Sequence, residues 1–101
     1  TVKTLRFRNQ DLPYATNWLD KHTFQFQFGE DHLLDKEGDP YMIFFEYHTD
    51  EIKWIVEIRW EQDHVSWDSL VNPNVYITKK EIAAIKKIAE KEMLNSLHTN
   101  H

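Results

Sequence analysis

The chain has no cysteine, and only two glycines and three prolines among its 101 residues. Without cysteine it can form no disulfide, no thiol nucleophile and no thiolate metal site. With Gly29 and Gly38 alone, it lacks the glycine-rich loop that cradles phosphate in nucleotide-binding proteins. No apolar run approaches the roughly 18 residues of a membrane span. We therefore expect no cofactor and no membrane partner.

The composition of the chain predicts a folded domain. Hydrophobic residues make up 41% and aromatic residues 14% of the sequence, which is enough for a core of ordinary composition. The length predicts a single domain over residues 1–101. Residues at the start of the chain do not follow the basic-then-apolar pattern of a signal peptide, which favours a cytoplasmic location.

Charge is spread unevenly along the chain, whose net charge is −5. Residues 30–68 contain twelve acidic and three basic residues, whereas residues 1–29 and 69–101 each carry a small basic excess. An acidic surface attracts a basic protein surface and repels a phosphate backbone. The distribution predicts a basic protein as partner and makes nucleic acid the less favoured one.

Alternating apolar residues predict most of the strands. Residues 2–8 fit a strand with Leu5 and Phe7 inward, and residues 24–28 fit a second with three phenylalanines on one face. Residues 41–60 predict a hairpin that pairs Tyr47 with Trp54. Its turn is either two residues, Asp50-Glu51, or a four-residue loop from His48 to Glu51. Apolar residues at every second position from Ile52 to Trp60 are expected to face inward.

Two segments have features of helices. Residues 11–21 combine an N-cap candidate with apolar residues at helical spacing, namely Asp11 followed by Leu12, Ala15, Trp18 and Leu19. Residues 79–97 follow the capping-box pattern of Thr78 and Glu81 and carry an apolar stripe. The stripe consists of Ile82, Ile85, Ile88, Ala89, Met93 and Leu97.

The remaining segments predict connections and one more strand. Residues 30–40 hold five acidic residues with Gly38 and Pro40 and predict a polar loop after a strand that ends at Gly29. Residues 64–68 predict a short strand, and residues 72–74 a turn. The resulting order, β-α-β-β-β-(β)-α, predicts an α+β two-layer sandwich. Its antiparallel sheet would have four to five strands, with two helices on one face.

The other face of this sheet is mixed in character and is the predicted binding surface. The candidate protein-binding residues are Phe44, Glu46, Ile55, Glu57 and Glu61. Apolar side chains among carboxylates are typical of an interface with a basic partner. We expect a small non-enzymatic binding module, for example an inhibitor or immunity-type partner of a basic nucleic-acid-binding protein, because no catalytic motif is present. Open sheet edges also allow a homodimer.

Two alternatives remain open from the residues. A nucleic-acid-binding domain would use the basic residues of both ends, namely Arg6, Arg8, Lys80, Lys87 and Lys91. A small metal-dependent protein would use Glu46 and His48, two apart on one strand, with a third ligand from His22, His32 or His64. The spacing matches no metal motif, so we predict no metal site. Of the four tryptophans, Trp18, Trp54 and Trp60 have the phase of core residues, and the phase of Trp67 is less clear.

Overall fold

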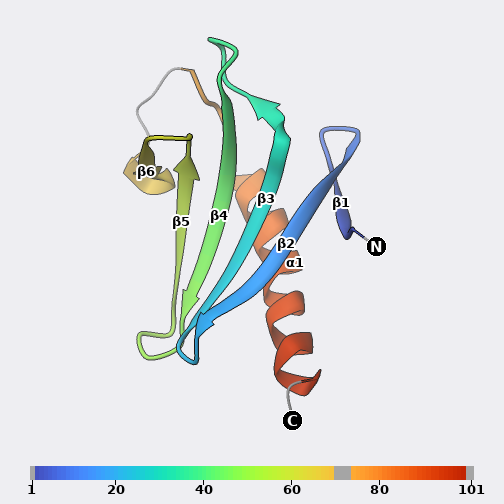
Figure 1. Cartoon of the computed structure of the whole chain (residues 1–101), viewed down its shortest axis with the longest axis vertical. Helices are drawn as coiled ribbons and strands as arrows, with labels where there is room; N and C mark the ends of the chain where they lie inside the picture. Colours follow the sequence, from blue (N-terminus) through green and yellow to red (C-terminus); the bar gives the residue numbers. More distant parts are fainter. Residues whose placement is uncertain (1, 70–73, 100–101) are drawn as a thin grey trace.

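The computed structural model describes residues 2–69 and 74–99 (Figure 1). Six antiparallel strands form one sheet in which each strand pairs with its neighbours in the chain, and one C-terminal helix lies against one face. The predicted α+β class is confirmed. The predicted four to five strands and two helices are wrong, because the segment expected to be the first helix is a strand.

The strands form a meander, so every second turn lies at the same end of the sheet. The elements are β1 Thr4–Phe7, β2 Gln10–Asp20, β3 Thr23–Leu34, β4 Pro40–His48, β5 Lys53–Arg59, β6 His64–Ser66, the 3₁₀ helix η1 Trp67–Ser69 and α1 Lys79–Thr99. The β3–β4 and β5–β6 turns therefore share one end, at the top of Figure 1. The β2–β3 and β4–β5 turns share the other.

The segment 11–21 is β2, not a helix. Leu12 and Trp18 fit both a helical and an alternating pattern, but the intervening Tyr14 extends only the alternation. Tyr14 stacks on Phe26 of β3 with the ring centres 4.9 Å apart, so strand pairing buries an aromatic ring that the helical pattern ignores. Tertiary pairing thus decides between two local patterns.

The segment 30–40 is only partly a loop, because β3 continues past Gly29 to Leu34. Phe28 pairs with Ile43 and Leu33 pairs with Tyr41, so β3 advances five residues while β4 advances two. The extra residues form a bulge in which Gly29 has a φ of +91°. A Cβ at Gly29 would collide with the side chain of Leu33, so both conformation and space require glycine.

The predicted hairpin is confirmed in its register. Tyr47 pairs with Trp54, and the Phe45–Val56 and Ile43–Ile58 pairs follow. The turn itself comprises the four residues 49–52, between the paired His48 and Lys53, so the two predicted turns, residues 50–51 and residues 48–51, are both wrong in their bounds. Ile52 therefore lies in the turn with a φ of +52° and is 79% exposed, so the expectation that it faces inward is wrong.

The predicted C-terminal helix and its capping box are confirmed by α1. The Thr78 hydroxyl accepts the backbone N–H of Glu81 at 3.1 Å, and the Glu81 carboxylate accepts the backbone N–H of Thr78 at 3.0 Å. These two bonds satisfy donors that the first helical turn leaves free. The predicted apolar stripe packs on the inner face of the sheet up to Met93, whereas Leu97 is 43% exposed, so its expected place in the stripe is wrong. The core includes Phe24, Phe26, Phe28, Ile43, Phe45 and Ile58 of the sheet and Ile82, Ile85, Ala89 and Met93 of α1.

The short strand predicted over residues 64–68 is β6, and it is shorter than expected. It ends at Ser66, and Trp67 begins η1, where its indole N–H donates to the Ile77 carbonyl at 3.3 Å. Residues 72 and 73 of the predicted turn lie outside the described residues. All four tryptophans pack against the core. Within the described ranges, no helix is long and apolar enough to cross a membrane.

Candidate protein-binding surface

The face of the sheet opposite α1, here called the open face, holds four of the five predicted binding residues. Phe44 pairs with Glu57 and Glu46 pairs with Ile55, so the four side chains form one patch on β4 and β5. Glu61 follows β5 and lies in the β5–β6 turn. The antiparallel register therefore brings the predicted residues together, with Glu61 at one end.

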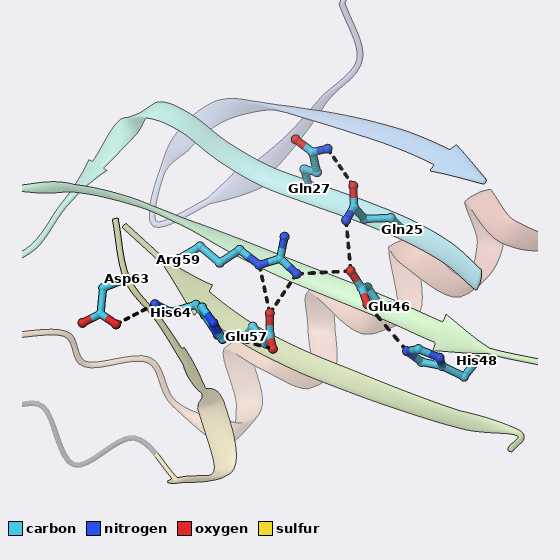
Figure 2. A network of polar contacts seen from close by, with 8 residues as sticks. All are labelled: Gln25, Gln27, Glu46, His48, Glu57, Arg59, Asp63 and His64. Atoms are coloured by element: carbon cyan, nitrogen blue, oxygen red, sulfur yellow. Dashed lines mark hydrogen bonds and ion pairs between the residues drawn. The ribbon is translucent and has the colours of Figure 1, made fainter. Parts of the chain in front are cut away.

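The two glutamates of this patch are already paired with a cation of the same chain (Figure 2). Arg59 donates from Nε to Glu57 Oε1 at 2.9 Å, and its Nη2 lies 2.8 Å from the same oxygen. Nη2 also donates to Glu46 Oε2 at 3.2 Å. Because one guanidinium satisfies both carboxylates, Glu46 and Glu57 contribute less free negative charge than the sequence predicted.

Further contacts fix the centre of the open face. Gln25 donates to Glu46 Oε2 at 3.0 Å and accepts from Gln27 at 2.8 Å (Figure 2). His48 Nε2 lies 3.5 Å from Glu46 Oε1. Gln25 is only 7% exposed, although it is on the side away from the helix. Buried polar networks of this kind rigidify a surface, so the centre of the open face is a scaffold.

A hollow of about 380 Å³ opens beside this network, at the end that carries the β3–β4 turn. We call it the acidic hollow. It is lined by Glu30, Asp31, Pro40, Tyr41, Met42, Phe44, Arg59, Trp60 and Glu61. Two of the predicted binding residues, Phe44 and Glu61, belong to it. Glu30, Asp31 and Trp60 were not predicted, because the first two were expected in a loop and Trp60 in the core.

The β3 bulge supplies the carboxylates of one wall. Asp31 has a φ of +62°, a left-handed conformation that few residues other than Gly, Asn and Asp adopt readily. Glu30 and Asp31 are both exposed, as is Glu61 on the opposite wall. Within residues 2–69 and 74–99, these three side chains make no hydrogen bond and no ion pair. They are therefore free to interact with a ligand.

Trp60 is held between this hollow and a second one. Its indole N–H donates to Asp35 Oδ2 at 3.0 Å, and its ring centre lies 6.2 Å from that of Tyr41. The other oxygen of Asp35 accepts the backbone N–H groups of Glu37 and Asp39. Burial tends to raise the pKa of Asp35, but these hydrogen bonds outweigh it and the pKa is lowered. Asp35 thus stays ionised and anchors Trp60.

The second hollow adds more carboxylates at the same end of the sheet. It shares Pro40, Trp60 and Glu61 with the acidic hollow. The two are lined together by the seven acidic residues Glu30, Asp31, Asp35, Glu37, Asp39, Glu61 and Asp63. Most of the acidic residues of the segment 30–68 therefore lie at one end of the molecule and not over the whole open face.

The predicted metal ligands do not form a three-residue cluster. His22 faces Asp50 at 3.3 Å and His64 lies 3.8 Å from Glu57, while His32 is exposed in the bulge. In the part of the chain that the structure describes, no third ligand atom joins Glu46 and His48. Carboxylate oxygens of Asp35, Glu37 and Asp39 do lie within 4.8 Å of one another. Both Asp35 oxygens, however, already accept hydrogen bonds, one from backbone N–H groups of the turn and the other from the Trp60 indole.

The basic residues of the nucleic-acid alternative are brought together only in part. Arg6, Arg8 and Lys80 line one groove between β1 and α1, and Lys87 and Lys91 are exposed farther along the helix. Arg6 pairs with Asp11 at 3.2 Å. Arg8 binds both carboxylate oxygens of Glu81 at 2.6 and 2.8 Å and the Tyr76 carbonyl.

The strongest of these ion pairs ties the β1–β2 turn to the start of α1. Its hydrogen bonds lower the pKa of Glu81 to about 2 and raise the pKa of Arg8. Both arginines of the predicted nucleic-acid surface therefore have carboxylate partners within the chain.

Comparison with protein-family models found no family that matches the chain, and comparisons with curated proteins and with solved structures found no significant match.

Proposed function

We propose that this chain is a non-enzymatic protein-binding module that binds a basic protein surface through the acidic hollow. The observation that carries the proposal is the set of three exposed carboxylates, Glu30, Asp31 and Glu61, which have no partner among the described residues and line a hollow with aromatic and apolar residues. Free charge at the rim steers an oppositely charged partner, and aromatic residues supply the buried contact.

The proposed binding surface therefore lies at the end of the sheet that carries the acidic hollow, and not over the whole open face. Phe44 and Glu61 remain in this surface as lining residues of the hollow. Glu46 and Glu57 instead hold the Arg59 guanidinium, which packs on the Phe44 ring. Ile55 pairs with Glu46 and lies next to this network, outside the hollow. Charge gathered at one end suits a partner with a compact basic patch, such as a nucleic-acid-binding protein that this chain inhibits or neutralises.

The surface is large enough for more than a single side chain. A third hollow of about 460 Å³ continues from the acidic hollow, with which it shares Glu30 and Met42. It extends over Tyr14, Ala15 and Gln27 toward β2. Adjoining hollows on a rigid face match the shape of an interface that forms without large rearrangement.

The test is capture of partners from the lysate of the protein's own host, after nuclease treatment, with matched charge variants. The variant Glu30→Lys/Glu61→Lys reverses two charges of the acidic hollow. The control Glu51→Lys/Glu90→Lys reverses two exposed charges elsewhere and has the same net charge. We expect the wild type and the control to retain a stoichiometric basic protein, which the hollow variant loses.

Two results contradict the proposal. The first is a partner retained equally by both variants, because its binding would then not use the acidic hollow. The second is a partner whose affinity does not fall as salt is added, since contacts between exposed charges are screened by salt.

One observation favours a second function. Lys80, Lys87 and Lys91 are exposed on one face of α1 and make no ion pair within the described residues. We infer as a second function the binding of nucleic acid through these lysines. A mobility shift at low salt that is lost in Lys80→Gln/Lys87→Gln/Lys91→Gln would support this, and an absent shift would contradict it.

A further inference from the structure

We propose that the acidic hollow binds an arginine side chain of the partner and prefers arginine to lysine. This inference rests on the proposed function and names the group that the hollow recognises. It is carried by the juxtaposition of Trp60, whose ring is fixed, with the exposed carboxylates of Glu30 and Glu61, which have no partner in the described part of the chain.

The chain already shows how this face holds a guanidinium group. The Arg59 guanidinium carbon lies 4.0 Å from the centre of the Phe44 ring, and its nitrogens bind Glu57 and Glu46. An aromatic face and carboxylate oxygens together satisfy both properties of the group, its flat apolar surfaces and its in-plane donors. The acidic hollow, which Arg59 and Phe44 also line, adds an aromatic ring and a carboxylate of the same kinds in Trp60 and Glu61.

The geometry favours arginine for a physical reason. A guanidinium group is planar and weakly hydrated, so it stacks on an indole while donating two parallel hydrogen bonds to a carboxylate. An ammonium group is compact and strongly hydrated, so its transfer from water to the binding site costs more hydration free energy. Tryptophan is also the best aromatic partner for a cation. Equal charges therefore do not predict equal affinities at this site.

Trp60 is positioned before the ligand arrives. The hydrogen bond from its indole N–H to Asp35 and the adjacent Tyr41 ring limit its rotation. Asp35 is in turn fixed by backbone N–H groups of its own turn. A preorganised ring loses little conformational entropy on binding, so the stacking energy is largely retained.

The test uses two fluorescent peptides of equal length and charge, one with four arginines and one with four lysines in a Gly-Ser background. Their affinities for the full chain are measured by anisotropy at low salt. We expect the arginine peptide to bind at least fivefold more tightly. In Trp60→Leu the preference should fall to less than twofold, whereas Tyr76→Leu, which alters an aromatic ring 73% exposed outside the hollow, should keep it.

The outcomes separate this inference from the proposed function. Equal affinities for the two peptides would overturn the arginine preference and leave the binding of basic surfaces intact. Failure of both peptides to bind would overturn the two together. If circular dichroism shows that Trp60→Leu is unfolded, Glu30→Gln/Glu61→Gln decides, and an arginine preference unchanged in that variant would overturn the inference.

Discussion

Arg59 stacks on Phe44 with its guanidinium carbon 4.0 Å from the ring centre, across the β4–β5 pair. The same side chain binds Glu57 and Glu46, so two carboxylates that the sequence offers as a binding surface belong instead to an internal network. That network holds the rings and strands next to the acidic hollow in place. In the described part of the chain, the carboxylates that line the hollow and have no partner are those of Glu30, Asp31 and Glu61.

Removal of Arg59 should destabilise the fold, because Glu46 is only 18% exposed at its side chain and would lose its cation. We expect Arg59→Leu to lower the free energy of unfolding by about 1–3 kcal/mol and Arg59→Lys by about 0.5–1 kcal/mol. Urea denaturation measures both. Equal losses in the two variants would contradict this expectation, because they would show that a positive charge without the planar fork retains none of the stabilisation.

Gly29→Ala should be the more damaging of the two glycine substitutions. Both glycines have a positive φ, +91° for Gly29 and +87° for Gly38, but a Cβ at Gly29 also collides with Leu33, while Gly38 has open space. We expect Gly29→Ala to lower the free energy of unfolding by about 2–4 kcal/mol and Gly38→Ala by about 1 kcal/mol. Losses of the same size would mean that the bulge tolerates a shift of Leu33.

Acid should destabilise the protein partly through Glu81. Hydrogen bonds from Arg8 lower its pKa from 4.5 to about 2, so the stabilisation is complete above pH 4.5 and is lost as the pH falls toward 2. Since Arg8 is 43% exposed, solvent screening limits the effect to about 1–2 kcal/mol. Urea denaturation at pH 6 and pH 3 should show a smaller acid loss for Glu81→Gln than for wild type. Glu90→Gln should behave as wild type.

Base should destabilise the protein through Tyr14. Burial and the hydrogen bond that it donates to Glu92 at 3.0 Å raise its pKa to about 12. The stabilisation is present below pH 10 and is lost as the pH rises toward 12. In Glu92→Gln the phenol should titrate at a lower pH, still above 10 because burial persists. Ultraviolet titration, with Tyr14→Phe to assign the transition, measures it, and an unchanged pKa would contradict the role of Glu92.

The sequence predicts correctly those parts of the fold in which the residues fit only one secondary-structure pattern. The β4–β5 hairpin follows from two alternating runs whose apolar faces agree in only one register. The start of α1 follows from the Thr78–Glu81 capping box. In β2 the two patterns compete, and Phe24, Phe26 and Phe28 of the neighbouring strand favour the extended one. That information is not local.

The acidic hollow was less predictable because a bulge forms one of its walls. Leu33 is buried on the same side as Phe28, five positions earlier, which breaks the two-residue period of β3. This change of phase, directly after Gly29, is the sequence signal that could have revealed the bulge. The pairing of Arg59 with Glu46 spans two strands and depends on a side-chain rotamer, so no spacing in the sequence indicates it.

The most direct measurement is a chemical-shift map of the ¹⁵N-labelled chain during titration with the four-arginine peptide. We expect the largest shifts at the Trp60 indole N–H and at the backbone amides of Glu30, Asp31 and Glu61. The β2–β3 and β4–β5 turns at the opposite end of the sheet should stay unchanged. Shifts confined to those turns or to α1 would contradict the assignment of the acidic hollow as the binding surface.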